Sequence, residues 1–403
     1  MKKLIALLIC IALLTATGCS KQKQAENNEI TETPQMMDNP QTTTQPETEV
    51  TQVSDYVPEQ VPMAAISLPV SETNAYTEDD VLLFTYRCQT ISLIIPDSEI
   101  EQKVILDLQN RLDGFYADAQ EISDRAKKDY IAGQDWTNYF FEVLYKPMRI
   151  DLSVLSLYGE NTSWVGGAHP SKNCISSNYD LVTGDVLTLG SILTHEDALQ
   201  TLCDLLIEEV ADIKAEKYLF TDYEDIIHNR FSQNESYNET WYFSNEGLSF
   251  YFSPYEIAPY SSGVITITIP YEKLTGIIED RYFPAEREIA NGTLNLVQEA
   301  DANLEDFTQI AEVILDSSGE MLFLYTNLSV HNVLVEIGAL DENGNFIHEK
   351  SVFAAPILTP GDAIMLKAHT ADDQSTIKVS YQTNDQTITQ FIQTDDQGNV
   401  TLK

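Results

Sequence analysis

The spacing of apolar residues changes near Pro284, and this change constrains the fold more than any other feature of the sequence. Beyond Pro284, short apolar stretches are separated by turn-forming segments such as Ser317-Ser-Gly and Asp341-Glu-Asn-Gly. Short strands at such spacing, without helical periodicity, are typical of a β-sandwich. We therefore predict a small all-β, sandwich-like domain over residues 286–403. Its strands are expected at 292–297, 308–315, 320–326, 332–340, 346–353, 363–368, 375–383 and 387–393.

The region before Pro284 mixes two periodicities. Apolar residues recur every three or four positions over 98–131, which predicts a long amphipathic helix with Ser98 as its N-cap. A second helix is predicted over 196–218. Other segments alternate apolar and polar residues or contain turn signals, as strands and hairpins do. Strands are expected within 81–95, at 140–144, 148–158 and 264–269, hairpins at 178–189 and 241–252, and a short helix at 271–280. Strands interrupted by a few helices predict an α+β domain over 71–285.

The N-terminus has the pattern of an export signal. Lys2 and Lys3 precede an apolar run and the small-residue sequence Ala16-Thr17-Gly18, and residues 1–18 are therefore interpreted as a signal peptide. With Cys19 this segment resembles a bacterial lipobox, although alanine replaces the usual leucine at its first position. The resemblance implies that Cys19 is lipidated and anchors the chain to the outer face of the cell membrane. The alternative is an ordinary signal peptide with a chance cysteine.

Residues 19–70 are interpreted as a disordered stalk, because they are rich in Thr, Gln, Pro and Glu and offer little apolar surface to bury. The remainder is long enough for about two domains. The formal net charge of the chain is −40, which argues against binding to nucleic acids and favours cationic partners, with solubility as the alternative explanation. Once Cys10 leaves with the signal, Cys88, Cys174 and Cys203 remain beside Cys19. Whether two of the three form a bridge stays open.

Three segments of the predicted α+β domain together resemble a known bacterial family. They are Trp164-Val-Gly-Gly-Ala-His-Pro170, Asn178-Tyr-Asp-Leu-Val-Thr-Gly-Asp185 with Leu187-Thr-Leu189, and Phe250-Tyr-Phe-Ser-Pro-Tyr-Glu-Ile-Ala-Pro-Tyr-Ser-Ser-Gly263. Together they are similar to the extracytoplasmic domain shared by PdaC-like peptidoglycan deacetylases and RsiV-like anti-sigma factors. The resemblance implies an envelope-facing α+β domain that recognises lysozyme or the cell wall. The chain lacks the deacetylase catalytic domain and a segment to hold a sigma factor, so neither output carries over.

The same segments contain the candidate binding residues, which are Gly166, Gly167, His169, Pro170, Tyr255, Glu256 and Tyr260. The two glycines favour a tight turn, and His169 precedes a proline. As a catalytic base, His169 would need an orienting acid, for which Asp180 and Asp185 are candidates, or else it is a histidine bonded to backbone. Prolines 254 and 259 stiffen a loop that either presents its two tyrosines and Glu256 to a ligand or forms a structural corner.

We expect a binding or sensing module rather than an enzyme, with lysozyme or peptidoglycan as the partner and no cofactor or metal. No phosphate loop, nucleophile elbow or H-E-x-x-H motif occurs in the sequence. Two alternatives remain, namely an enzyme acting on a cell-wall glycan and a purely structural envelope lipoprotein. We also expect 70–285 and 286–403 to fold independently.

Overall fold

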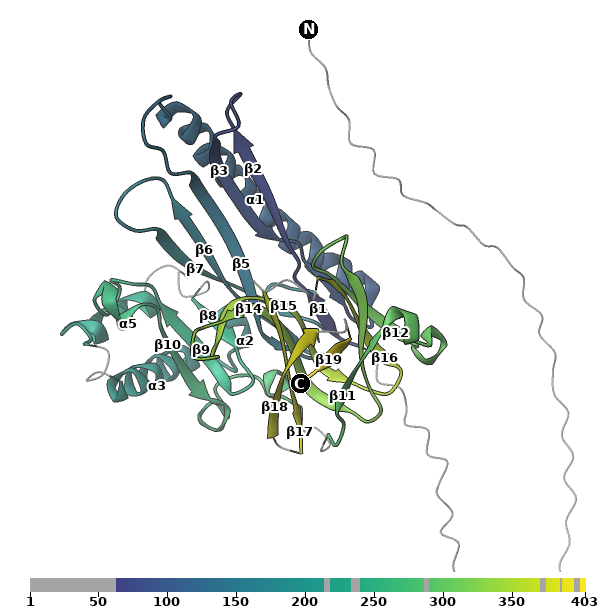
Figure 1. Ribbon diagram of the computed structural model, residues 1–403. Coiled ribbons are helices and arrows are strands. Elements are labelled where there is room, and N and C mark those ends of the chain that lie inside the picture. Colours follow the sequence, from purple (N-terminus) through teal and green to yellow (C-terminus); the bar gives the residue numbers. More distant parts are fainter. Residues whose placement is uncertain are drawn as a thin grey trace, which may run out of the picture. The chain divides into compact units, whose positions relative to one another are not determined.

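A computed structural model describes residues 63–213, 218–232, 240–285, 290–369, 375–384, 386–394 and 399–403. All of them lie in one compact unit, Glu59–Lys403. The predicted signal peptide, Cys19 and the stalk as far as residue 62 lie outside the described residues. The architecture is α+β, as predicted, and contains three hydrophobic cores (Figure 1).

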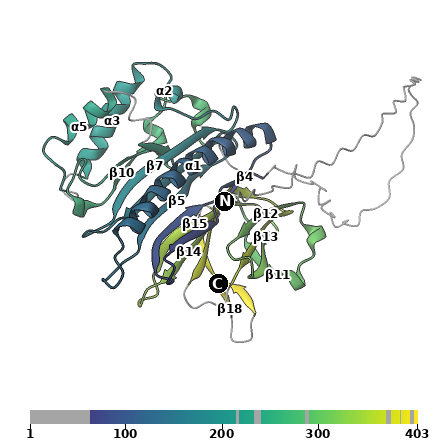
Figure 2. The same ribbon diagram turned by 90° about the horizontal axis from the view of Figure 1, so that it is seen from above.

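The first core lies between a five-stranded sheet and a long helix. The sheet has the order β2-β3-β5-β6-β7, in which only β3 and β5 are parallel to each other. Its strands are β2 (Val70–Tyr76), β3 (Leu82–Gln89), β5 (Tyr139–Ile150), β6 (Val154–Trp164) and β7 (Ser171–Asp180). Helix α1 (Ser98–Asp129) makes the crossover from β3 to β5 that a parallel pair requires. Figure 2 shows α1 lying along the sheet.

Helix α1 confirms the predicted amphipathic helix, with Val104, Leu108 and Leu112 buried against the sheet. Its N-cap is Asp97 rather than Ser98, because the Asp97 carboxylate accepts hydrogen bonds from the N–H groups of Glu99 and Ile100.

The second core belongs to residues 187–283 and Val154. Helices α3 (Ala198–Asp212) and α5 (Tyr223–Ser232) lie beside the three-stranded sheet β10-β9-β8. The strands are β8 (Trp241–Phe243), β9 (Gly247–Phe252) and β10 (Ile265–Pro270), and a short helix α2 (Leu189–Ile192) precedes α3. Three 3₁₀ turns complete the region, namely η2 (Tyr260–Ser262), η3 (Tyr271–Lys273) and η4 (Asp280–Tyr282).

Three sequence predictions for this region need correction. The predicted helix 196–218 is confirmed over α3, its residues 214–217 lie outside the described residues, and the sequence reading missed α5. The predicted helix 271–280 is replaced by η3 and η4. The predicted hairpin 178–189 keeps its turn, with Gly184 at φ 71°, but its second strand shrinks to one bridge between Tyr179 and Val186. The chain then enters α2 at Leu189, because Thr188 and Ser191 form a capping box.

The third core lies between two sheets and confirms the sandwich-like prediction. The larger sheet has the order β19-β18-β17-β14-β15-β1-β4, and the smaller has the order β11-β13-β16-β12. The larger sheet comprises β1 (Ala65–Ser67), β4 (Ser92–Ile94), β14 (Val330–Leu340), β15 (Phe346–Leu358), β17 (Thr376–Thr383), β18 (Gln386–Thr394) and β19 (Val400–Leu402). The smaller comprises β11 (Leu294–Gln298), β12 (Gln309–Ile314), β13 (Glu320–Thr326) and β16 (Asp362–Ala368), and the turns η5 (Glu299–Asp301) and η6 (Leu304–Asp306) connect β11 to β12.

Two strands of the larger sheet come from the N-terminal part of the chain. Strand β1 pairs with β15 through Ile66 and Ala354, and on its other side with β4. Residues 63–68 are buried in this arrangement, so the predicted stalk cannot extend to residue 70. The Gln89 amide adds a further link, because its nitrogen donates to the Ser351 carbonyl at 2.9 Å.

Candidate functional site

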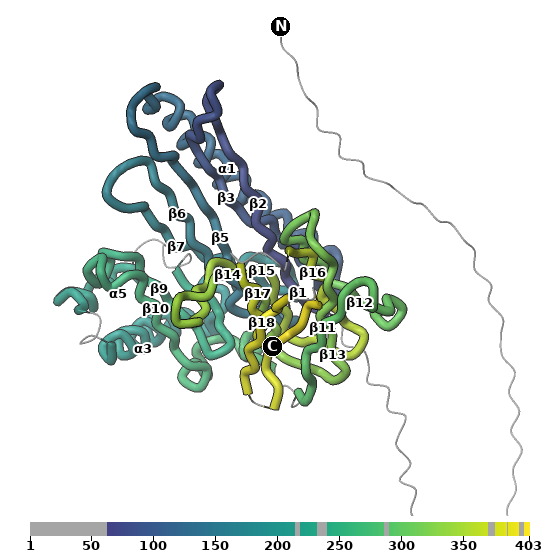
Figure 3. The backbone as a smooth tube through the Cα atoms, viewed as in Figure 1, coloured from purple at the N-terminus to yellow at the C-terminus, as the bar shows by residue number. Residues whose placement is uncertain are grey.

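The structure brings together two of the three sequence motifs at one end of the five-stranded sheet. The chain leaves β6, passes through residues 165–170 and returns as β7 (Figure 3). The His169 ring in this connection stacks on Tyr260, with ring centroids 4.9 Å apart. Tyr255 completes the cluster at 5.4 Å from Tyr260. The rings of His169, Tyr255 and Tyr260 are hereafter called the aromatic cluster.

An open groove of about 410 Å³ lies beside the aromatic cluster. It is lined by Glu160, Thr162, Pro170, Lys172, Pro254, Tyr260, Gly263 and Val264. Glu160 and Thr162 project from β6 on the face opposite the core, and Lys172 stands directly across from Thr162 on β7. The Lys172 ammonium lies 2.7 Å from the Glu160 carboxylate. The groove therefore combines aromatic rings with hydrogen-bonding groups of both charges.

Glycines shape the walls of the groove. Gly166 (φ 87°) and Gly167 (φ 118°) adopt backbone conformations that disfavour side chains, in a connection that bends over residues 165–169. The Trp164 indole N–H donates to the Gly167 carbonyl at 3.2 Å and fixes this turn. On the other wall, Gly263 (φ 67°) ends the turn η2 that holds Tyr260.

Tyr255 has an unusual backbone conformation for its residue type. Its φ of 72° lies in the left-handed region, where a bulky residue is strained. Its side chain is nevertheless 65% exposed, so burial does not offset that strain. Tyr218 combines a φ of 54° with 77% exposure in the same way, so this conformation by itself assigns no role to Tyr255.

Glu256 has a structural place in this loop. Its carboxylate accepts from the Arg230 guanidinium and from the Ser253 N–H, the latter at 2.9 Å. Arg230 also donates to the Tyr251 carbonyl at 3.1 Å and lies over the Phe252 ring at 4.5 Å. Glu256 thus fastens the loop to α5 and β9, whereas the two tyrosines face outward. The contacts of Glu256 match the structural corner, and the binding role of the two tyrosines stays a prediction.

His169 is exposed, and its Nδ1 lies 3.2 Å from the Pro170 carbonyl oxygen. The two acids named as its orienting partners are engaged elsewhere. Asp180 is buried and pairs with Arg281 at 2.7 Å, and Asp185 pairs with Lys103 on α1 at 2.5 Å. The geometry therefore matches the histidine bonded to backbone rather than an acid–base pair with either aspartate.

Behind the groove lies a polar cluster that the sequence reading missed. The Tyr158 hydroxyl lies 3.0 Å from Glu160 and 3.1 Å from the Cys174 sulfur. Burial, reinforced by Cys174 and Glu160, holds the pKa of Tyr158 well above its ordinary value. Burial also raises the pKa of the Cys174 thiol, which keeps it out of the reactive thiolate form. Successive side chains of a strand point to opposite faces, so a strand predicted to run on through Thr162 would have placed Tyr158, Glu160 and Thr162 on one face.

Within the described ranges, no three His, Cys, Asp or Glu side chains are arranged to hold a metal ion. Cys88, Cys174 and Cys203 are free thiols, which answers the question of a bridge among them. None of the helices in the described part of the chain has the length and apolar character of a membrane span.

Fold and groove together define an α+β protein with an open, ligand-sized groove beside an aromatic cluster. Residues 190–272 match a protein family described as "Protein of unknown function (DUF3298)". The matched segment contains α3, α5, β8, β9 and β10, and it supplies the Tyr255–Tyr260 wall of the groove. Strands β6 and β7, which supply the other wall, lie outside it.

Two solved structures are similar to this chain. One is a DUF3298 family member from Bacteroides fragilis NCTC 9343, with 16% sequence identity and a TM-score of 0.37, covering 55% of this chain and 96% of that protein. The other is a DUF3298 family protein from Pseudomonas aeruginosa PAO1, with 19% identity and a TM-score of 0.35, covering 55% and 97% respectively. The search of curated proteins found no match.

Proposed function

We propose that this chain is a membrane-anchored, extracytoplasmic binding module that holds a cell-wall glycan in the groove beside the aromatic cluster. The observation that carries the proposal is the stacking of His169, Tyr255 and Tyr260 at the rim of an open groove. The N-terminal signal pattern with Cys19 and the resemblance to envelope ectodomains support the location.

The chemistry of the groove suits a sugar. The apolar C–H face of a pyranose ring packs on an aromatic ring, and tyrosine adds a hydroxyl at its wet edge. Glu160, Lys172 and Thr162 provide acceptors and donors for sugar hydroxyl and acetamido groups. A groove that is open along its length admits the middle of a polymer, which an enclosed pocket does not.

A cationic protein such as lysozyme is the second candidate ligand. It is favoured by the net charge of −40 and by the 65% exposure of Tyr255, a residue type common in protein-binding hot spots. Electrostatic attraction would speed its association at low salt, and screening over about 8 Å at physiological salt would slow it.

Titration calorimetry with the full chain tests the proposal. The probes are a soluble oligomer of β-1,4-linked N-acetylglucosamine, purified peptidoglycan in a parallel sedimentation assay, and lysozyme. Tyr260→Ala should weaken glycan binding by about tenfold or more, as loss of an anchor does. Leu106→Ala, at an exposed apolar position on α1, is the matched control and should change nothing.

Each outcome separates the alternatives. Heat with the oligomer, lost in Tyr260→Ala only, supports glycan binding. Heat on mixing with lysozyme, but not with the oligomer, would show that the ligand is a protein. Release of new reducing ends from peptidoglycan would show an enzyme, and the absence of binding to all three probes would leave a structural lipoprotein.

A further inference from the structure

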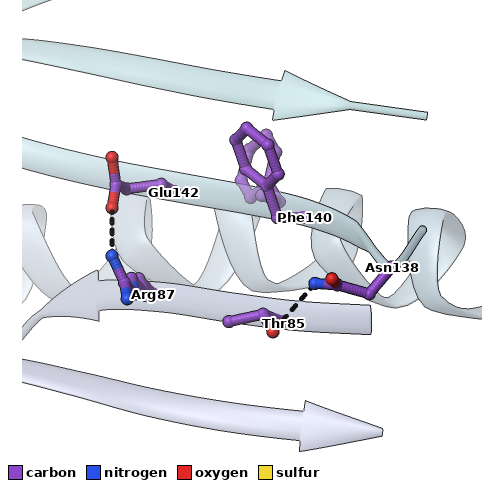
Figure 4. A pocket seen from close by; sticks show the side chains of 6 residues that line it. Thr85, Arg87, Asn138, Phe140 and Glu142 are labelled. Atoms are coloured by element: carbon purple, nitrogen blue, oxygen red, sulfur yellow. Dashed lines mark hydrogen bonds and ion pairs between the residues drawn. The ribbon is translucent and has the colours of Figure 1, made fainter. Parts of the chain in front are cut away.

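The five-stranded sheet has a second pocket on the face that carries the groove. This pocket of about 310 Å³ is lined by Thr85, Arg87, Asn138, Phe140, Phe141 and Glu142. Tyr139, Phe141, Val143 and Tyr145 of β5 are buried in the core with α1, so Phe140 and Glu142 project from the opposite face. Figure 4 shows Arg87 and Glu142 reaching toward each other from neighbouring strands, with Phe140 beside them.

Strand register connects the pocket to the groove. Arg87 stands next to Glu142, Glu142 is directly opposite Thr162, and Thr162 is directly opposite Lys172. On the outer side, Glu72 stands opposite Arg87. These five side chains form one row that crosses all five strands and is hereafter called the transverse row. Arg87 and Glu142 line the pocket, and Thr162 and Lys172 line the groove.

The pocket and the groove adjoin along the transverse row, because Glu142 of the pocket is directly opposite Thr162 of the groove. The residues that line the two pockets run from Arg87 on β3 to Lys172 on β7, and three steps of about 4.8 Å between neighbouring strands span roughly 14 Å. A monosaccharide fills one pocket, whereas an occupant of both must be a chain that runs across the strands. Apolar surface is available from Phe140 on the central strand β5 and from the aromatic cluster beside β6 and β7.

The charges of the transverse row indicate which kind of linear polymer it can bind. Glu72 and Arg87 pair at 3.0 Å, Arg87 and Glu142 at 3.5 Å, and Lys172 pairs with Glu160 at 2.7 Å. Acids and bases alternate and compensate one another, so the row attracts neither a polyanion nor a polycation strongly. Partly exposed ion pairs still offer donors and acceptors to neutral hydroxyl and amide groups.

We infer that the Phe140 pocket and the groove at Tyr260 are two ends of one extended site, which binds a linear, uncharged glycan across the strands of the sheet. This inference rests on the proposed function and adds to it the length and direction of the ligand. Binding therefore gains free energy when the glycan is long enough to contact both ends.

The test compares a disaccharide with a hexasaccharide of β-1,4-linked N-acetylglucosamine, by calorimetry on the full chain. The hexasaccharide should bind at least about tenfold more tightly. Phe140→Ala should bring its affinity down toward that of the disaccharide and leave disaccharide binding at Tyr260 unchanged. Glu142→Gln, which preserves shape, should weaken only the hexasaccharide and covers the case in which Phe140→Ala misfolds. Leu106→Ala on α1 remains the control.

The results distinguish the two levels of the proposal. Equal affinity for both sugars, with no effect of Phe140→Ala or Glu142→Gln, overturns the extended site but leaves glycan binding at Tyr260 intact. If neither sugar binds, both the proposal of a glycan ligand and the proposal of an extended site are wrong. Thermal unfolding of each variant shows whether a loss of binding reflects a loss of fold.

Discussion

Tyr255 has a backbone conformation that is unusual for a tyrosine. Glycine adopts its φ of 72° without strain. We predict that Tyr255→Gly keeps or raises the free energy of unfolding, by up to about 1 kcal/mol, because relief of strain offsets the greater entropy of the unfolded chain. Glycan affinity should fall in the same variant. Urea unfolding and calorimetry measure the two effects separately.

Tyr76 provides the matched control, since it is 54% exposed but lies in strand β2. Tyr76→Gly should lower stability, because glycine costs backbone entropy in an extended segment. A clear loss of stability in Tyr255→Gly as well would show that the Tyr255 ring supports the loop.

Glu256 gives the opposite expectation, because its carboxylate fastens the loop to the buried side chain of Arg230. Glu256→Gln should cost about 2 kcal/mol of stability, since a buried guanidinium loses its charged partner. Glycan binding should weaken only to the extent that the loop opens. A variant of normal stability with abolished binding would move Glu256 into direct contact with the ligand.

Asp151 links stability to pH. Burial opposes its ionisation, but the Arg149 guanidinium at 2.7 Å and hydrogen bonds from Ser153 outweigh that and hold the pKa of Asp151 below its ordinary value. A carboxylate with a lowered folded-state pKa stabilises the fold above its unfolded pKa of about 3.9. That stability is lost as the pH falls through the lower folded-state pKa.

Asp151→Asn should therefore cost about 3 kcal/mol at neutral pH, because Arg149 is left buried without its charged partner. The difference from the unmodified protein should begin to shrink as the pH falls below about 4, where Asp151 of the unfolded chain takes up a proton. It should be smallest below the lower folded-state pKa, where Asp151 is protonated in both states. Urea unfolding across this pH range measures it. A difference that stays constant with pH would contradict the assignment.

At the scale of elements, local sequence patterns predict helices and hairpins, but they do not show which distant segments pair with one another. The periodicity of 98–131 predicted α1, because one side of that helix alone meets the sheet. The apolar and turn signals of 241–252 likewise predicted the pair β8 and β9. The same rules missed α5, whose sequence begins with the acidic segment 222–225 and carries only a short apolar stripe.

The candidate site shows the same division. The glycine turn and the proline-flanked tyrosines were visible as motifs, and the structure stacks His169 on Tyr260. Glu160, Thr162 and Lys172 were not singled out, because their place in the groove depends on the register between β6 and β7. Register is fixed by which face of each strand is buried, and that depends on the packing of α1.

At the scale of the whole molecule, the two predicted domains share a sheet. Strand β1 lies between β15 and β4, and Met63 and Ala65 belong to the core of the sandwich. We now predict that residues 286–403 alone lack a cooperative unfolding transition, because the edge of β15 and part of the core lose their cover. Residues 59–403 should unfold in one transition. Calorimetry on both forms measures this, and a sharp transition of the isolated 286–403 would restore independent folding.

The position of β1 also imposes an order in time on the folding of the chain. Ile66 emerges early from the ribosome, yet its partner Ala354 is made near the end of synthesis. In an exported chain the N-terminal part also crosses the membrane first, so the apolar strand waits there without its sheet until the C-terminal strands arrive. The protein therefore cannot fold strictly from its first residue to its last. The seven-stranded sheet is complete only when β15, from the C-terminal part of the chain, pairs with β1, from its N-terminal part. Until then, the unpaired β1 must be kept from pairing with other chains.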